Sequence, residues 1–279
     1  MRASSCVGRA YATTVLTLTV LTKIATADAA APTPFADGLT GNDIYSKIIE
    51  NRFRSFRQES KLISADRTGR SQESRFNMRW QDFRDENGDA PRGIMSKTLV
   101  KYSHPFDIRH SGYLIQANKG RSNDQFIYYP SRRRVVRVNL RNQSIYGTDF
   151  SFEDVIPREA EDFAYRRLAD ATVEAVPVFV LELNPKEFTD SEYSKIEVKV
   201  DKERFVILRS RYWDQAEVEI KRFSAETAQV QQFEGVWVTM KSKMKNLLLE
   251  SYTELIITKV VANPDFASDT FDLGRLEGH

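Results

Sequence analysis

The 279-residue chain carries 41 lysine and arginine residues against 39 aspartate and glutamate residues, and it has a single cysteine. This near balance of charge excludes the strongly basic domain or stripe of a nucleic-acid-binding protein. The cysteine, Cys6, lies close to the N-terminus. We therefore expect no disulfide framework, no thiol chemistry and no cysteine-based metal site.

The N-terminal segment predicts export. Arg2 and Arg9 precede a short apolar run from Ala12 to Leu21, and residues 25–29 contain two overlapping small-x-small cleavage patterns. This layout is typical of a secretory signal peptide. An uncleaved anchor is the alternative, but a membrane span needs about 20 apolar residues, and Lys23 interrupts the end of this run.

We expect three segments: a signal peptide at residues 1–29, a flexible tether at 30–39 and a single domain at 40–279. Cleavage would remove three of the 41 basic residues and one of the 39 acidic residues, which leaves 38 of each. The mature protein is then uncharged overall and lies in the periplasm. Any contact with a membrane is expected to be peripheral or transient.

The chain after the tether predicts a helix. Thr40 is a candidate N-cap, and Asp43 three residues later completes an approximate capping box. Six apolar residues then recur at helical spacing and form one face: Ile44, Tyr45, Ile48, Ile49, Phe53 and Phe56. The pattern predicts a helix from Asp43 to Phe56 that packs across the concave side of a sheet.

From residue 61 onward the hydrophobic period changes from that of a helix to that of a strand. Phe76, Met78 and Trp80 alternate with polar neighbours, and similar stretches joined by short turns continue to Val261, among them one strand at residues 236–244. Residues 152–170 interrupt them with helical spacing and predict a second, short helix. We expect about ten to eleven strands in one strongly curved antiparallel sheet with an apolar and a solvated face.

The patterns that catalysis or metal binding requires are missing from the sequence. His104, His110 and His279 are its three histidines, and none lies in a nucleophile elbow, a phosphate-binding loop or a zinc-ligand spacing. We predict no catalytic residue, no metal and no cofactor, and hence no enzyme. The remaining enzymatic alternative is an envelope hydrolase that uses Asp149 and Glu153 as paired carboxylates.

A run of arginines at residues 132–141 lies just before these carboxylates. The planar guanidinium matches the geometry of a carboxylate, so internal ion pairs are favoured over a calcium or catalytic site. We predict that Arg134, Arg137, Asp149 and Asp154 form structural ion pairs. Asp149 should be at least half buried, and it should contact an arginine of this run or nearby backbone N–H groups.

Aromatic and methionine side chains at alternating positions predict an apolar cavity. Two helices cannot hide the whole apolar face of such a sheet, and the excess forms either an inter-sheet core or a ligand cavity. Methionine and aromatic walls suit irregular apolar ligands. The candidate lipid-binding wall consists of Phe76, Met78, Trp80, Tyr113, Phe126 and Tyr128. The sequence leaves open which strand faces point inward.

Three motifs in order carry a resemblance to a known family. They are Pro105-Phe106-Asp107-Ile108-Arg109, residues 129–138 (YPSRRRVVRV) and residues 146–154 (YGTDFSFED). Residues 105–155 thereby resemble the outer membrane lipoprotein-sorting family of LolA-like periplasmic proteins. Many members are encoded beside exporters of the resistance-nodulation-division type. The first motif departs from the family, because His110-Ser111 follow it where Gly-Thr is frequent, which affects the local turn.

The resemblance implies a mainly β fold, an incomplete antiparallel half-barrel around an apolar cavity with helices covering the concave side. It implies a carrier that shields lipid or lipoprotein acyl chains and works with an inner-membrane exporter in transport toward the outer membrane. The alternative is a non-carrier periplasmic adaptor or sensor module of a resistance-nodulation-division type exporter, with a filled barrel.

Overall fold

The computed structural model describes residues 35–277, apart from residues 141–142, 157, 188 and 190. The expected signal peptide and the first part of the expected tether lie outside the described residues. Residues 39–279 make up one unit of the chain, and every helix and strand described here belongs to it.

The elements follow one another in a chain dominated by strands. In order they are α1 (Gly41–Glu50), β1 (Ser55–Ala65), β2 (Ser71–Asp82), β3 (Ile94–His104), β4 (Gly112–Asn118), β5 (Asp124–Tyr129), β6 (Arg134–Val138), α2 (Phe152–Val155), β7 (Phe163–Val173), β8 (Val176–Pro185), β9 (Tyr193–Asp201), β10 (Ile207–Asp214), β11 (Glu219–Ala225), β12 (Val230–Phe233), β13 (Val236–Thr239), β14 (Lys241–Asn246), β15 (Ser251–Ala262) and α3 (Leu273–Glu277). Short 3-10 turns lie at Pro91–Gly93, Pro130–Arg132, Ala160–Asp162 and Thr227–Gln229.

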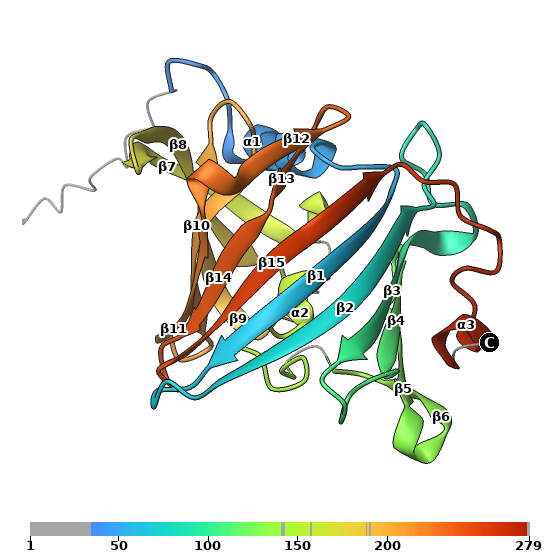
Figure 1. The fold of residues 1–279 in the computed structure, drawn as a ribbon. Helices are drawn as coiled ribbons and strands as arrows, with labels where there is room; N and C mark the ends of the chain where they lie inside the picture. The colour runs from blue at the N-terminus through green and yellow to red at the C-terminus, as the bar shows by residue number, and fades with distance from the viewer. Residues whose placement is uncertain (1–34, 141–142, 157, 188, 190, 278–279) are drawn as a thin grey trace, which may run out of the picture. The chain divides into compact units, whose positions relative to one another are not determined.

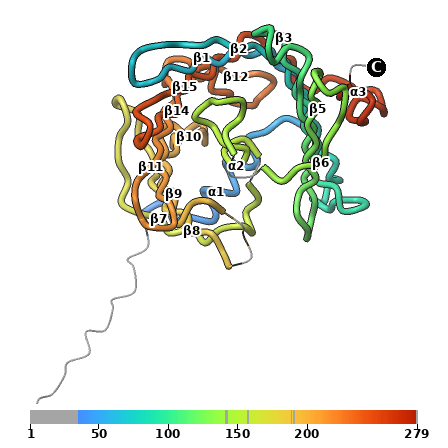
Figure 2. Tube along the Cα trace, turned by 90° about the horizontal axis from the view of Figure 1, so that it is seen from below, coloured from blue at the N-terminus to red at the C-terminus, as the bar shows by residue number. Residues whose placement is uncertain are grey.

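Within the described residues, thirteen strands form one antiparallel sheet in the order β6-β5-β4-β3-β2-β1-β15-β14-β11-β10-β9-β8-β7. β1 pairs with β15, so the first and last strands of the chain meet in the middle of the sheet. The sheet curves strongly (Figure 1) and surrounds α1 and α2 (Figure 2), while β6 and β7 remain its two ends. The expected half-barrel is confirmed, with more strands than the sequence predicted.

The alternation of side chains gives each strand two different faces. On β4, Tyr113 and Ile115 belong to the main core on the concave side, whereas Leu114 points the other way and packs with Phe271 and Leu276. The C-terminal segment with α3 therefore covers the outer face of β4, β5 and β6. Because both faces are covered there, β4 is an almost unbroken run of buried residues.

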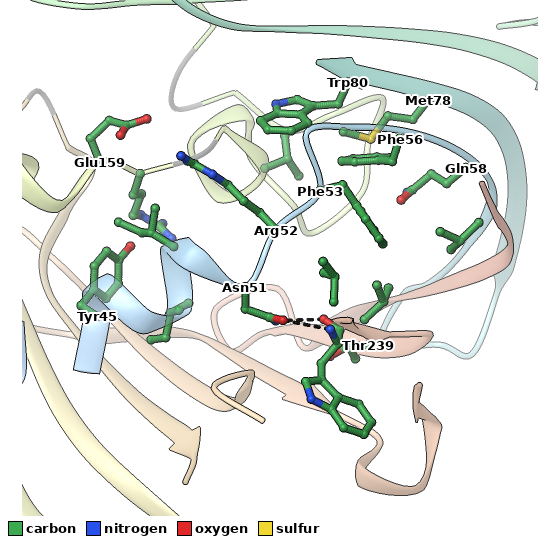
Figure 3. A pocket seen from close by; sticks show the side chains of 18 residues that line it. Tyr45, Asn51, Arg52, Phe53, Phe56, Gln58, Met78, Trp80, Glu159 and Thr239 are labelled. Carbon is green, nitrogen blue, oxygen red and sulfur yellow. Dashed lines mark hydrogen bonds between the residues drawn. The ribbon is translucent and has the colours of Figure 1, made fainter. Parts of the chain in front are cut away.

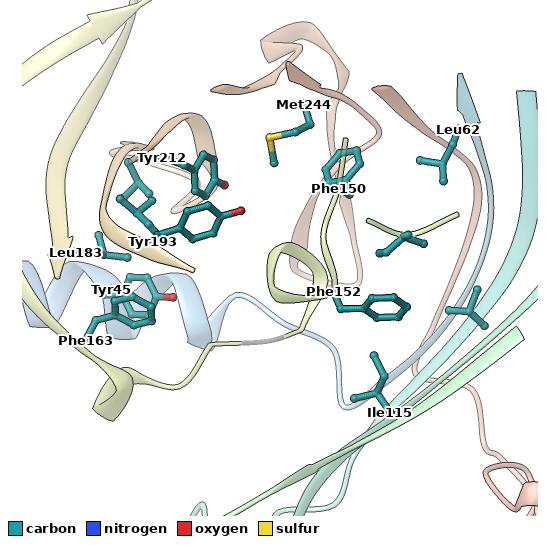
Figure 4. Close-up of a cluster of buried hydrophobic side chains, with 14 of the residues drawn as sticks. Tyr45, Leu62, Ile115, Phe150, Phe152, Phe163, Leu183, Tyr193, Tyr212 and Met244 are labelled. Carbon is teal, nitrogen blue, oxygen red and sulfur yellow. The ribbon is translucent and has the colours of Figure 1, made fainter. Parts of the chain in front are cut away.

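An inserted segment completes the main core on the concave side. Residues 143–156 follow β6 and carry Phe150 and Phe152 into the core. Figure 4 shows these two rings among side chains from both halves of the sheet. Phe152 packs edge-on against Tyr113 with 5.2 Å between ring centroids. Each large apolar side chain buried in this way contributes about 1.5–3 kcal/mol of stability, so the burial of Phe150 and Phe152 holds the inserted segment on the concave side.

The first helix begins as the sequence predicts. The Thr40 Oγ1 accepts a hydrogen bond from the Asp43 N–H at 3.2 Å, and Asp43 Oδ2 accepts one from the Thr40 N–H at 2.8 Å, which confirms the capping box. α1 then packs on β7, where a Cβ atom added to Gly41 would lie 3.2 Å from the backbone nitrogen of Arg167. Glycine at this position thus lets the helix approach the strand closely.

The predicted end of this helix at Phe56 is wrong, because α1 ends at Glu50. Phe53 and Phe56 have a spacing that suits a helical face, but Phe56 belongs to β1 and lies opposite Trp80 of β2. Cross-strand packing of these two rings therefore outweighs the local helical pattern.

The second predicted helix, at residues 152–170, is wrong over most of its length. α2 spans only Phe152–Val155, and β7 begins at Phe163. β7 pairs with β8 through a tight hairpin in which Glu174 and Ala175 have φ values of 49° and 69°. Positive φ at both central positions suits a two-residue hairpin. Neither residue is a glycine or an asparagine, so no turn motif marks this hairpin in the sequence.

Residues 236–244, predicted as one strand, form two. β13 pairs with β12 in a separate two-stranded hairpin, whereas β14 joins the main sheet between β11 and β15. The break lies at Met240, whose N–H donates to the Gln229 carbonyl and whose carbonyl accepts from the Ile257 N–H, both at 2.8 Å. The β12–β13 hairpin thereby leaves the sheet and becomes available to line a pocket.

Candidate binding pocket

A pocket of about 450 Å³ lies between α1, strands β1 and β2, the β12–β13 hairpin and the segment that follows α2. Figure 3 shows the side chains that line it. Its volume falls in the range of about 300–1,000 Å³ that is usual for sites of small molecules. The pocket occupies the part of the concave side that the inserted segment leaves open.

Three strands supply one wall through residues that lie opposite one another. Gln58 of β1 faces Met78 of β2 and Val260 of β15, and Phe56 faces Trp80 across β1 and β2. Directly opposed residues of an antiparallel pair share a face, so all five point to the same side. The rings of Phe56 and Trp80 stack with centroids 5.6 Å apart and an interplanar angle of 19°, which makes part of this wall flat and aromatic.

α1 supplies a second wall through Tyr45, Ile48 and Ile49, which share one face of the helix. Tyr45 stacks on Tyr165 of β7 with ring centroids 4.4 Å apart. Burial raises the pKa of Tyr45 above its ordinary value, so its hydroxyl stays neutral at physiological pH. The helix thus presents a largely apolar surface to the pocket.

Asn51 ties the end of α1 to β13. Its Nδ2 donates to the Trp237 carbonyl at 3.0 Å, and its Oδ1 accepts from the Trp237 N–H at 2.9 Å (Figure 3). The side-chain amide thereby makes the two hydrogen bonds that a neighbouring strand would make. Because Trp237, Val238 and Thr239 line the pocket, this contact sets the separation of two of its walls.

Charged side chains gather at one end of the pocket. Arg84 holds Asp82 through Nε and Nη2, at 3.0 Å each, and Glu159 through Nη1 at 2.8 Å. Arg52 reaches Asp82 at 3.2 Å. Burial raises the pKa of Glu159 even though both arginines oppose the shift. Burial also acts to raise the pKa of Asp82, but the hydrogen bonds from Arg84 outweigh it and lower that pKa overall.

Two further side chains of the pocket lining carry donors without an acceptor. The Nε and Nη2 atoms of Arg158 and the indole Nε1 of Trp80 are shielded from solvent and make no hydrogen bond to any described residue. Burial acts to lower the pKa of Arg158, but the tyrosine and carboxylate groups around it outweigh this effect and raise that pKa. The guanidinium is therefore charged, and the pocket combines an apolar part with a donor-rich end.

The structure divides the predicted lipid-binding wall between three places. Met78 and Trp80 line the pocket, and Phe76 and Tyr113 lie in the main core on the concave side. Phe126 and Tyr128 pack on the opposite face, in the cluster covered by the C-terminal segment. Contact of any of the six with a lipid remains a prediction.

The physical reason for this division is strand register. On the β4–β5 pair, Tyr113 lies opposite Ile127, and Leu114 lies opposite Phe126. A period of two therefore places Phe126 and Tyr128 on the face away from Tyr113. The sequence could identify both strands but not their mutual register.

The predicted ion-pair residues have partners other than each other. Arg137 pairs with Asp124, and Arg134 is exposed and forms no ion pair with any described residue. Asp154 is held by Lys221 at 3.1 Å and by the Tyr193 hydroxyl at 2.8 Å.

Asp149 is buried, as predicted, but hydroxyl groups of β15 hold its carboxylate. It accepts hydrogen bonds from Ser251 and from Thr253, the latter at 2.8 Å. The inserted segment places the acidic motif beside β15 and β9. Arg134 and Arg137 lie on the end strand β6. No described arginine contacts Asp149.

The carboxylates of the hydrolase alternative are engaged separately. Asp149 binds β15, whereas Glu153 accepts from the Ser191 hydroxyl and from the Glu192 N–H at 2.8 Å, just before β9.

In the described part of the chain, no group of three or more His, Cys, Asp and Glu residues could hold a metal ion. No helix among the described residues is long and apolar enough to span a membrane.

Sequence reasoning missed most of the pocket outside β2. Trp237 and Val238 were placed in a strand of the main sheet, Phe53 in a helix, and Arg158 in the segment predicted to be the second helix. The aromatic character of Phe53 and Trp237 was visible, but their joint position depends on the β12–β13 hairpin leaving the sheet. No local pattern encodes that departure.

The open sheet, the covering helix and the concave pocket define the class: a LolA-type half-barrel. The crystal structure of a DUF1329 family protein from Desulfovibrio piger is similar with a TM-score of 0.78 and 18% identity, over 85% of this chain and 97% of that chain. An outer membrane lipoprotein-sorting protein domain from Vibrio parahaemolyticus gives 0.76 and 21%, over 85% and 98%. A LolA superfamily protein from Nitrosomonas europaea gives 0.64 and 16%, over 84% and 97%.

At these identities the likeness shows the fold, and it confirms the fold that the sequence motifs implied. A family model described as "uncharacterized protein" matches residues 95–278, and the chain belongs to this family. A comparison with curated proteins found no match.

Proposed function

We propose that this protein is a non-enzymatic periplasmic carrier that shields an apolar chain in the pocket beside α1. The observation that carries the proposal is the pocket itself, about 450 Å³ in volume and lined by Phe53, Phe56, Met78 and Val260 on its apolar side. Each methylene group buried there contributes about 0.8 kcal/mol. A chain of about ten to fifteen groups gains about 8–12 kcal/mol before the entropic cost of binding is subtracted.

The fold supports this proposal, because two of the similar structures are named as a lipoprotein-sorting domain and a LolA superfamily protein. We extend to this chain a cargo of lipid or lipoprotein acyl chains. We also propose the periplasm as its compartment, an inner-membrane exporter of the resistance-nodulation-division type as its partner, and transport toward the outer membrane as its role.

A second candidate function is supported by the filled part of the concave side. Phe150 and Phe152 occupy space that a large cargo would need, and both are buried in the main core. A half-barrel with a packed interior suits an adaptor or sensor module of the same type of exporter. The two candidates differ in whether the protein holds a ligand.

Native mass spectrometry of the protein purified from its own periplasm tests the carrier. We expect an adduct with the mass of one lipid, and recovery of that lipid in an organic extract. The delipidated protein should bind a lipophilic fluorescent probe at one site, and the extracted lipid should displace the probe. Absence of both the adduct and probe binding would refute the carrier and favour the adaptor.

A further inference from the structure

The guanidinium of Arg158 presents one edge without a partner. Nε and Nη2 are the two nitrogens of that edge, and neither donates a hydrogen bond to a described residue. Both N–H groups of such an edge point the same way, which gives a fork that matches two oxygens of one anionic group. A buried charged donor without an acceptor destabilises a protein. A ligand that supplies the acceptor would remove this cost.

Other arginines of this chain show what the edge binds. Arg84 uses Nε and Nη2 to hold both oxygens of Asp82 at 3.0 Å each. Arg166 holds Glu182 through the same edge at 3.1 and 2.8 Å. In each pair the edge meets the two oxygens of one carboxylate. Arg158 has the same edge beside the pocket, but no described carboxylate occupies it.

The layout of the pocket separates charged from apolar side chains. The Trp80 Nε1, whose ring stacks on Phe56 in the aromatic wall, is a further buried donor without an acceptor. Figure 3 shows Arg52 and Glu159 at one end of the pocket and Phe56 and Met78 toward the other. A ligand that fits must therefore place hydrogen-bond acceptors at one end and an apolar chain at the other.

We propose that the pocket binds a single-chain amphiphile whose anionic head, a carboxylate or a phosphate, accepts hydrogen bonds from the Nε–Nη2 edge of Arg158. This inference rests on the proposed carrier function and names its ligand class. At roughly 30 Å³ for a group the size of a water molecule, the pocket holds about fifteen methylene-sized groups. That number suits one acyl chain, so within the proposed cargo this inference selects lipids with a single chain.

The test compares ligands that differ only in the head group. Palmitate, its methyl ester and 1-palmitoyl lysophosphatidate are titrated against a lipophilic probe bound to the delipidated protein. We expect at least one of the two anions to bind about 10- to 100-fold more tightly than the ester, the effect of a hydrogen bond to a charged group. The tighter of the two anions identifies the carboxylate or the phosphate as the natural head.

Variants then assign the preference to Arg158. Arg158→Gln should reduce the preference for the anion over the ester to about twofold or less, and Arg158→Lys should restore only part of it, because lysine keeps the charge but lacks the fork. Arg166→Gln is the matched control, since Arg166 lies on the exposed pair with Glu182, and it should keep the full preference.

Wild-type protein that binds the ester as tightly as both anions would overturn this inference while leaving the carrier intact. A protein that binds none of the three ligands and no probe would refute the carrier itself. The comparison of ligands on the wild type stands even if an Arg158 variant fails to fold.

Discussion

Replacement of Asp149 by alanine should destabilise the protein, because this carboxylate fastens the inserted segment to β15. It accepts hydrogen bonds from the Ser251 and Thr253 hydroxyls, and Thr253 is fully buried. Hydrogen bonds to a charged group contribute about 1.5–3 kcal/mol each. Thr253 keeps a second partner in Ser64 at 2.9 Å, so the loss should lie near the lower end, at about 3 kcal/mol in total.

For a domain of this size, a loss of about 3 kcal/mol lowers the melting temperature by about 6–12 °C. Thermal unfolding followed by circular dichroism measures the shift, and Asp107→Ala, at an exposed position, is the matched control. Surface substitutions usually change stability by less than about 0.5 kcal/mol. If Asp149→Ala melted within about 2 °C of the control, the inserted segment would not depend on this anchor.

Three further predictions concern the pocket and the stability of the sheet. Met78→Asp should abolish probe binding with an unchanged β-rich circular dichroism spectrum, whereas Tyr128→Asp, on the opposite face, should leave probe binding intact. Asn51→Ala removes both side-chain bonds to β13, so the Trp237 amide should exchange hydrogen faster by mass spectrometry; equal exchange would contradict the contact. The hydrogen bond from Arg121, with further donors, lowers the pKa of Asp124 to about 2 from 3.8. This stabilisation is present above about pH 4 and is lost as the pH falls through about 2. In acid unfolding, the free energy of unfolding of Asp124→Asn should therefore depend less on pH in that window than the free energy of unfolding of the wild type.

The sequence predicted those parts of the fold that depend on neighbours along the chain. The capping box of Thr40 and Asp43 was visible because its partners are three residues apart, and the alternation on β2 was visible because one face is apolar. Met78 and Trp80 therefore share one face of β2, and the structure shows that this face lines the pocket. The motif block added the half-barrel, which periodicity alone could not specify.

The errors lie where distant segments decide the outcome. Phe56 joins β1 because Trp80 offers a stacking partner, and β7 is a strand because β8 pairs with it through a hairpin that lacks glycine. Phe126 and Tyr128 lie on the opposite face from the predicted cavity wall. The sequence of one strand does not determine its register with the neighbouring strand, so this placement could not be predicted. Arg158 could not be predicted as a site residue, because a single arginine in a charged segment has no local pattern that marks its nitrogens as shielded from solvent.

The two ends of the open sheet have a consequence for how the protein behaves at high concentration. An end strand exposes unpaired N–H and C=O groups that can recruit another chain and start aggregation. α1 packs against β7 at one end, and β6 at the other is only five residues long, with Arg134 and Arg137 exposed. Short length and positive charge both discourage edge-to-edge pairing. Arg134 and Arg137 thus help to keep the β6 end of the sheet from pairing with another chain.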